Sequence, residues 1–101
     1  FEKFSCKTEI GGKYPTWEFK ENSDLQKLYC EVYSKQTGNQ PKVEAIHAGL
    51  ECAVFSSKIK DLDCIAIGPT IFDAHTVNER LSISSTQKIF GILKDVLKKL
   101  V

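Results

Sequence analysis

A polar loop with a single histidine follows an apolar run in the second half of the chain. The run is Cys64-Ile65-Ala66-Ile67-Gly68-Pro69, and the loop over 69–83 contains His75. In open α/β sheets, ligand-binding side chains lie beyond the carboxyl ends of buried strands. His75 is therefore the first candidate for chemistry. A solvated loop histidine would have the same local sequence, so one His is a weak motif.

A second group of candidates lies at the end of an earlier apolar segment. His47 and Gly49 close the segment 42–49, and Glu51 follows at the start of an expected helix. For His47 a structural role, a substrate contact and a metal ligand stay open, because an imidazole can satisfy both nitrogens locally. Glu51 has a purely structural alternative, since acidic residues are favoured at the positive N-terminal end of a helix.

Glu79 follows His75 by four residues, a spacing that suits a carboxylate orienting the loop or the imidazole, or a solvated charge. A hydrolytic zinc site uses several imidazole or carboxylate ligands and one open position for water. With two histidines, the chain cannot build a His-rich site alone. It also contains no Ser-His-Asp order, nucleophile elbow or phosphate-binding glycine pattern.

These candidates must be positioned by a small α/β arrangement. We expect parallel strands over 42–49 and 63–68, the second apolar on both faces, and a helix of about 50–59 between them. This β-α-β unit should have a right-handed crossover. We expect an edge strand over 1–10 that ends at Gly11-Gly12. The loop 69–83 should be poorly anchored when the chain is alone.

Two amphipathic helices should flank this unit. Ser23 and Gln26 form a capping box that begins a helix over 23–37, and Gly38 ends it. Ser84 and Gln87 predict a second helix over about 85–100. The second helix should bury one apolar stripe against the sheet, made of Ile89, Phe90, Leu93, Val96, Leu97 and Leu100.

Composition limits the classes of function. A chain of 101 residues with 42% hydrophobic residues has the size and composition of one soluble domain. A net charge of +1 gives no basic surface for nucleic acid or an anionic membrane, and no apolar run reaches membrane-helix length. The four cysteines lack zinc-ribbon spacing and should be reduced, which favours the cytoplasm. The absence of Met leads us to expect an excised fragment.

Three segments together resemble a known family. They are 43–52 (Val43 to Cys52), Ile67-Gly68-Pro69 and 73–83 (Asp73 to Ile83), and the upstream 12–17 extends the likeness over nearly the whole chain. They resemble the C-terminal part of the aminoacyl-histidine (Xaa-His) dipeptidases, carnosinase-like two-zinc metallopeptidases. The resemblance implies the C-terminal part of an α/β/α sandwich of the zinc-dependent exopeptidase class. Residues 1–12 would be the last strand of a lid domain with its hinge, and 13–101 part of the catalytic domain.

The resemblance also implies roles for individual residues. His75 matches the last metal ligand of the family, whereas Gly49 and Glu51 match a segment that lines the substrate cleft, which His47 would also face. The other ligands of the two zinc ions, or of other divalent metals, and the catalytic glutamate would lie upstream. The fragment alone should therefore be inactive and hold no stoichiometric zinc. One departure is Val77, which stands where the family usually has proline.

The implied activity of the whole protein is cytoplasmic hydrolysis of Xaa-His dipeptides. Its partners would be the dipeptide and the rest of its own catalytic domain, with a homodimer left open and no nucleic acid or membrane. Two alternatives remain open. One is a tripeptidase or N-acyl amino acid hydrolase of the same clan, and the other is a non-catalytic α/β interaction module.

Overall fold

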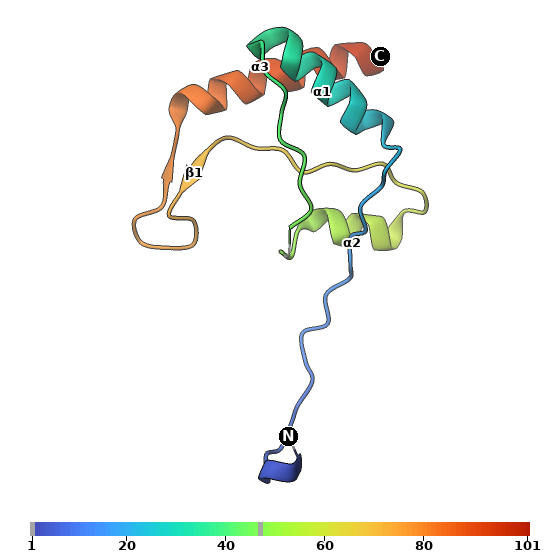
Figure 1. Cartoon of the computed structure of the whole chain (residues 1–101), viewed down its shortest axis with the longest axis vertical. Coiled ribbons are helices and arrows are strands. Elements are labelled where there is room, and N and C mark those ends of the chain that lie inside the picture. The colour runs from blue at the N-terminus through green and yellow to red at the C-terminus, as the bar shows by residue number, and fades with distance from the viewer. Residues whose placement is uncertain (1, 47) are drawn as a thin grey trace.

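The computed structural model describes residues 2–46 and 48–101. Within them, a short 3-10 helix over Glu2–Phe4 is followed by α1 (Asp24–Thr37) and α2 (Glu51–Lys58). The strands β1 (Ile71–Phe72) and β2 (Arg80–Leu81) come next, and α3 (Ile83–Leu100) follows them. The chain is thus a small mixed α and β structure, and the three predicted helices are confirmed (Figure 1).

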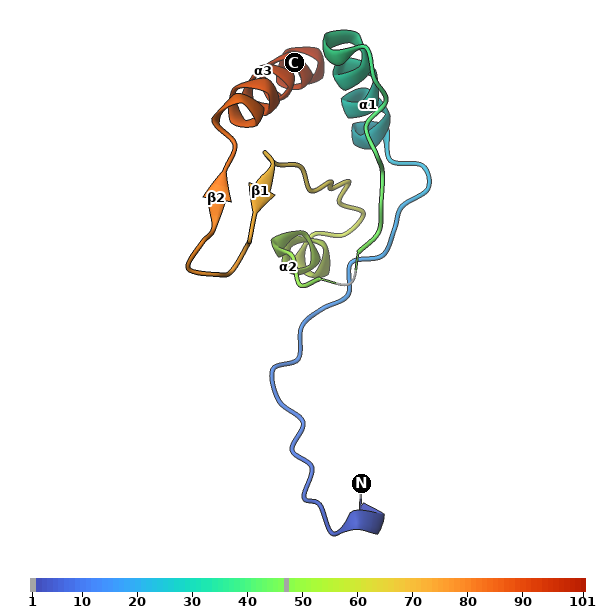
Figure 2. The ribbon, with the colours of Figure 1, turned by 60° about the vertical axis from the view of Figure 1, so that its left-hand side comes forward.

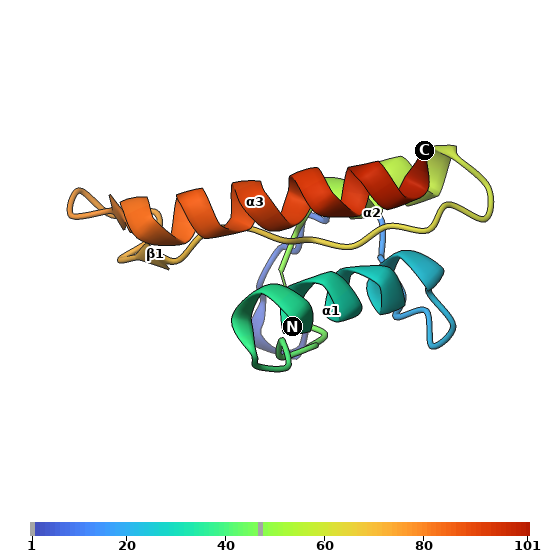
Figure 3. The ribbon, with the colours of Figure 1, turned by 90° about the horizontal axis from the view of Figure 1, so that it is seen from above.

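The core lies between α1 and α3, which pack side by side (Figures 2 and 3). Val32 of α1 meets Ile92 and Val96 of α3, and Ile92 is completely buried. Polar contacts close the edge of this interface. The Gln36 side-chain amide donates to the Asp95 carboxylate at 2.6 Å, and the Lys88 ammonium lies 4.9 Å from the Tyr33 ring centroid.

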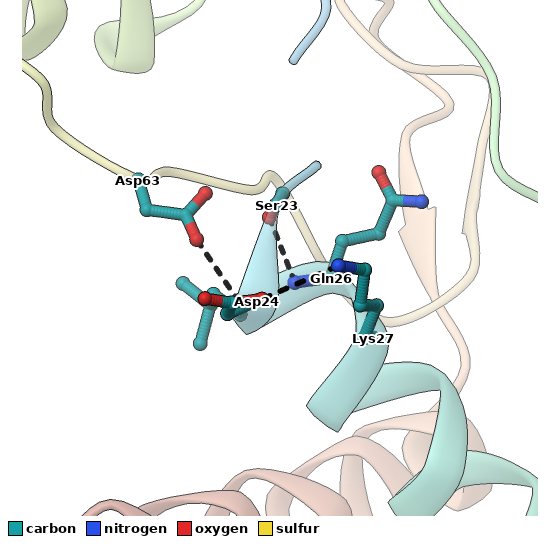
Figure 4. Close-up of polar contacts among 6 residues, drawn as sticks. Ser23, Asp24, Gln26, Lys27 and Asp63 are labelled. Carbon is teal, nitrogen blue, oxygen red and sulfur yellow. Dashed lines mark hydrogen bonds and ion pairs between the residues drawn. The ribbon is translucent and has the colours of Figure 1, made fainter. Parts of the chain in front are cut away.

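The ends of α1 follow the predicted capping. The Ser23 hydroxyl accepts a hydrogen bond from the Gln26 backbone N–H at 2.9 Å, and Gly38 takes a φ of +72° at the C-terminus. The backbone N–H of Leu25 is satisfied from far along the chain by the carboxylate of Asp63, at 3.0 Å (Figure 4). This bond lowers the pKa of Asp63 below the ordinary value of 3.8 and ties α1 to the extended segment that follows α2.

The N-terminus of α3 differs from the prediction. Its N-cap is Ser82, whose hydroxyl accepts from the Ser85 N–H, so the helix starts two residues before the expected start. The capping box at Ser84 is therefore wrong. Ser82 and Ser84 both offer a capping hydroxyl, but only Ser84 has Gln three residues later. The pairing of β2 up to Leu81 favours the earlier serine.

The apolar face of α3 also needs correction. Ile92, which the predicted stripe omitted, is the most buried residue, whereas Leu93 is 39% exposed. Exposed apolar side chains continue along this second face at Phe90, Leu97 and Leu100. The helix is apolar on two sides, and α1 covers one of them. In α2, Ala53 is buried, whereas Val54, Phe55 and the C-cap residue Ile59 are exposed.

The predicted β-α-β unit does not form within the described residues. The segments 42–46 and 63–68 are extended, but neither is hydrogen-bonded as a strand. The segment 62–70 instead passes as a single chain between α2 and the α1–α3 pair (Figures 1 and 2). The predicted strands are therefore wrong as paired elements, because among these residues neither has a neighbouring strand in register.

The N-terminal segment leaves the helical body as an extended chain (Figure 1). The edge strand expected over 1–10 is wrong for the described part, which is a 3-10 helix and then unpaired chain. The radius of gyration is consequently 18.0 Å, against about 13 Å for a compact domain of this length. No helix in the described part is long and apolar enough to cross a membrane.

Candidate functional site

The loop that carries His75 is closed by a short hairpin. Strands β1 and β2 pair antiparallel, with Ile71 opposite Leu81 and Phe72 opposite Arg80. Thr70 fastens the base of the hairpin to α3, because its N–H donates to the Ser85 hydroxyl at 2.8 Å and its carbonyl accepts from the Ser82 N–H at 3.0 Å. The expectation of a poorly anchored loop is wrong, because β1 and β2 pair within the loop and Thr70 bonds its base to the start of α3.

The tip of the hairpin is held by its own polar groups. The Arg80 guanidinium donates to the Asp73 carboxylate at 2.7 Å and lies 5.6 Å from the Phe72 ring centroid. The Thr76 hydroxyl and N–H both donate to the Asp73 carbonyl. Val77 is fully exposed at the tip, so it has no packing role here that its replacement of a proline would alter.

His75 itself adopts a left-handed backbone conformation, with a φ of +63°. For a residue with a Cβ atom this conformation costs on the order of 1 kcal/mol. The compensating contact is a 2.8 Å hydrogen bond from the His75 backbone N–H to the Glu79 carboxylate. Glu79 thus contacts the backbone of the candidate ligand, which fits an orienting role for the loop, and the His75 residue remains exposed.

The second group of candidates lies at the start of α2. Glu51 is exposed in the first turn of that helix, and Leu50 is its N-cap residue. The Tyr14 hydroxyl donates to the Leu50 carbonyl at 2.9 Å, and the Tyr14 ring lies beside Gly49. No periodic pattern could have predicted this contact of Tyr14 across such a sequence separation. His47 lies outside the described residues.

The hairpin and the N-terminal end of α2 lie on the same side of the α1–α3 pair (Figures 1 and 2). No hydrogen bond or ion pair connects them among residues 2–46 and 48–101. The structure therefore brings together His75 with Glu79, and Gly49 with Tyr14. It leaves these two groups as separate parts of the surface.

The cysteines do not add to either group. All four are free, as predicted. Burial, together with a hydrogen bond to the Cys52 thiol, raises the pKa of Cys64 to about 11. At neutral pH Cys64 is therefore a protonated thiol, and this protonation disfavours it as a nucleophile or metal ligand.

The donor set of the described residues does not complete a metal site. Among the described residues, no group of three or more His, Cys, Asp or Glu side chains is arranged to hold an ion. A protein zinc site needs three or four ligands. His75 is exposed, so its side chain is accessible to an ion or ligand from solvent.

One comparison with known proteins gives a clear match. The chain is 36% identical over 95 residues to the cytosol non-specific dipeptidase of Escherichia coli (strain K12). The match covers 94% of this chain and 20% of that protein, so the chain spans about a fifth of the length of this relative. No family model and no solved structure matches the chain. The chain is thus similar to one part of a dipeptidase.

Proposed function

We propose that this chain is the C-terminal part of the catalytic domain of a longer, metal-dependent dipeptidase. The observation that carries the proposal is the 36% identity to the E. coli dipeptidase along almost the whole chain. The unpaired extended segments add support, because they suit a piece of a larger α/β/α sandwich. We place the longer protein in the cytoplasm, as the name of the relative and the free cysteines favour.

His75 would supply one ligand to a site for two zinc ions or other divalent metals. The hairpin favours this role, since its internal bonds hold the His75 backbone in one conformation without help from the sheet. Glu79 would act through the His75 backbone as a positioning residue. The other ligands would lie in parts of the longer protein outside this chain.

Gly49 and Glu51, with His47, would line the substrate cleft beside the metal site. Tyr14 supports this turn through the Leu50 carbonyl. The finer proposal is a preference for Xaa-His dipeptides. The name of the relative describes it as non-specific, so a broad dipeptide range is the coarser alternative. No observation favours a tripeptidase, an N-acyl amino acid hydrolase or a non-catalytic module over these.

A chimera tests the proposal. The segment of the E. coli dipeptidase that matches this chain is replaced by residues 1–101, and dipeptide hydrolysis and zinc content are measured. We expect an active, zinc-containing enzyme in which His75→Ala loses one zinc and nearly all turnover while the circular dichroism spectrum is unchanged. Val77→Ala is the matched control, because Val77 lies in the same loop and is fully exposed.

The same chimera tests the substrate turn. Glu51→Gln should lower kcat/KM while the zinc content stays normal. A His75→Ala chimera that keeps both zinc ions and its turnover would refute the metal-ligand role. Loss of zinc in Glu51→Gln would refute the division of roles between the two groups of residues.

A further inference from the structure

Helix α2 has one covered face. Among the eight residues of the helix, only Cys52, Ala53 and Ser56 are buried or half-buried. Residues three and four positions apart lie on the same side of a helix, so these three side chains share one face. The Ser56 hydroxyl oxygen has almost no accessible surface and no hydrogen-bond partner among the described residues. This face, which we call the covered face of α2, is therefore shielded by packing against another part of the chain.

Cys64 lies opposite the covered face. It belongs to the extended segment that passes between α2 and the α1–α3 pair (Figures 1 and 2), and it is half-buried there. It borders a cavity of about 260 Å³ that also touches Leu50, the N-cap residue of α2. It borders a second cavity of about 270 Å³ that also touches Ser56. Cys52 lies between Leu50 and Ser56 along the helix, so these neighbours place Cys64 next to Cys52.

The two thiols are in contact. After burial, the largest cause of the raised pKa of Cys64 is a hydrogen bond with the Cys52 thiol. Both cysteines are free in this structure. Cys6 lies in the exposed N-terminal segment and Cys30 lies in α1, so neither belongs to the covered face. Two thiols in hydrogen-bonding contact need only a local adjustment to reach the S–S bond length of about 2.05 Å.

We propose that Cys52 and Cys64 are a redox-sensitive pair that closes to a reversible disulfide in the presence of a peroxide. The bond would link the first turn of α2 to the extended segment, and the loop that it closes would contain the rest of the helix. Disulfides of cytoplasmic proteins, when present, are usually transient and catalytic or redox-sensing. The proposal does not rest on the proposed function, because it concerns only contacts within this chain.

The oxidation takes two steps. Cys64 keeps its proton at neutral pH, so we assign the first attack to Cys52. The Cys52 thiolate sulfur bonds to one oxygen of hydrogen peroxide, the O–O bond breaks, and the leaving hydroxide takes up a proton as water, which leaves a sulfenic acid. The Cys64 sulfur then bonds to the Cys52 sulfur, and the hydroxyl group leaves with the Cys64 proton as a second water. A small thiol reverses the reaction through a mixed disulfide and is itself oxidised.

Peptide mapping of the oxidised chain tests the pairing. The reduced 101-residue chain is treated with hydrogen peroxide, its remaining thiols are alkylated, and it is digested with trypsin without reduction. Cleavage after Lys58 and Lys60 places Cys52 and Cys64 on separate peptides. We expect these two peptides to be linked, with a mass two hydrogens below the sum of the reduced peptides, and the other two cysteines to be alkylated. Dithiothreitol should restore four free thiols, and the circular dichroism spectrum should be the same in both states.

Serine variants separate the roles of the two thiols. Cys30→Ser is the matched control, because Cys30 is also half-buried but lies outside the covered face, and it should form the linked peptides at the rate of the wild type. In Cys64→Ser, Cys52 should accumulate as a sulfenic acid, which dimedone labels. In Cys52→Ser, the labelling of Cys64 should be at least tenfold lower, because its thiol stays protonated. Equal labelling of the two variants would refute the assigned order of attack.

Four results would overturn the proposal. The first is separate sulfenic or sulfinic acids at Cys52 and Cys64 with no linked peptides, and the second is a link from either of them to Cys6 or Cys30 instead. The third is a rate of bond formation that rises with the concentration of the chain, which would place the bond between two copies. The fourth is a loss of helicity on oxidation, because the native geometry would then not accommodate the bond. None of these readouts depends on metal or turnover, so they are independent of the role of His75.

Discussion

The α1–α3 pair and the extended segment 62–70 are both rich in apolar residues. They differ in how well their side chains are buried and their backbone groups are hydrogen-bonded. In the helix pair, Ile92 is completely buried, and apart from the capped ends each helix satisfies its own backbone groups. In the extended segment, Ile67 is 39% exposed, and the backbone groups of 62–69 have no hydrogen-bond partner among the described residues. A helix pairs its backbone internally and needs a neighbour only to bury its apolar face. A central strand needs strands along both edges for its backbone bonds and packing layers on both faces.

This difference shows which parts of the chain are self-sufficient. Helices and the local hairpin satisfy their backbone groups with residues close in sequence, so they form here. A strand depends on neighbouring strands for its backbone bonds, and among the described residues none pairs with the extended segment 63–68. The two regions are joined by Asp63, whose carboxylate accepts a hydrogen bond from the first turn of α1.

The largest expected effect is on the helix pair. Ile92→Ala removes a completely buried side chain from the interface with Val32, and large-to-small changes of this kind cost about 2–5 kcal/mol. Urea unfolding followed by circular dichroism measures the loss in the chain alone. A change below about 0.5 kcal/mol would show that this interface is not the core.

Leu93→Ala is the matched control on the next position of the same helix. Leu93 is 39% exposed, so its truncation should cost less than about 1 kcal/mol in the chain alone. The sequence-based expectation of a core position at Leu93 would have predicted several kcal/mol. A large loss at Leu93 together with a small loss at Ile92 would reverse the assignment of the two faces.

The next effect concerns thiol reactivity in the extended segment. The pKa of Cys64 is raised from 9.0 to about 11, and only the thiolate reacts, so alkylation at pH 8 should be slower than for an ordinary thiol by about 100-fold. Exposed Cys6 provides the internal control. Mass spectrometry after timed iodoacetamide treatment gives both rates. Equal rates at Cys6 and Cys64 would show that the segment does not bury this thiol.

A smaller effect should follow from breaking the tie between the two regions. Asp63→Ala removes the acceptor for the Leu25 N–H, and the loss of such a helix-terminal bond costs about 0.5–2 kcal/mol at pH 7. Asp63→Asn keeps an acceptor oxygen and should lose less. Thermal unfolding of the three proteins measures the order, and a more stable Asp63→Ala chain would contradict the capping role.

The same residue predicts a pH dependence. The pKa of Asp63 is lower in the folded state than its ordinary value of 3.8, so its charge contributes stability above pH 3.8. This contribution should disappear as the pH falls from about 4 through the lowered folded-state pKa. The stability difference between the wild type and Asp63→Asn should therefore shrink with acidification, and a constant difference would contradict it.

The smallest effect is expected at the hairpin. Glu79→Ala removes the acceptor for the His75 N–H from an exposed loop, so the global stability should change by less than about 0.5 kcal/mol. The local signature is faster exchange of the His75 amide, which NMR can follow. Glu79→Gln, which keeps an acceptor oxygen, should restore most of the protection. Unchanged exchange in Glu79→Ala would show that the contact does not hold the loop.

The fold was predictable where the signals are local. The Ser23 cap and Gly38 placed α1 within one residue, and the positions of α2 and α3 followed from periodicity. The buried face of α3 was not predictable, because the helix is apolar on two sides and the sequence does not say which side meets α1. The predicted strands over 42–49 and 63–68 were not found as paired strands, because apolar patterning predicts an extended segment but not whether a neighbouring strand lies in register with it.

The candidate site shows the same limit. The sequence indicated His75 and a four-residue link to Glu79, and the structure places the Glu79 carboxylate on the His75 backbone. No sequence pattern pointed to Tyr14, whose hydroxyl reaches the turn before α2 from a separate extended segment. None pointed to the antiparallel hairpin either, since β1 and β2 are only two residues long each.

The packing of Val32 on Ile92 and Val96 also has a kinetic consequence. Between these residues lie α2, the extended segment and the whole hairpin, so a long chain loop must close before the core can form. Loop closure is an entropic cost that precedes any gain from non-local contacts, and it slows folding. Throughout that delay the apolar run Cys64 to Ile67 is open to solvent with both edges free. A slow search of this kind favours misassembly between chains, so refolding yield should fall as the protein concentration rises.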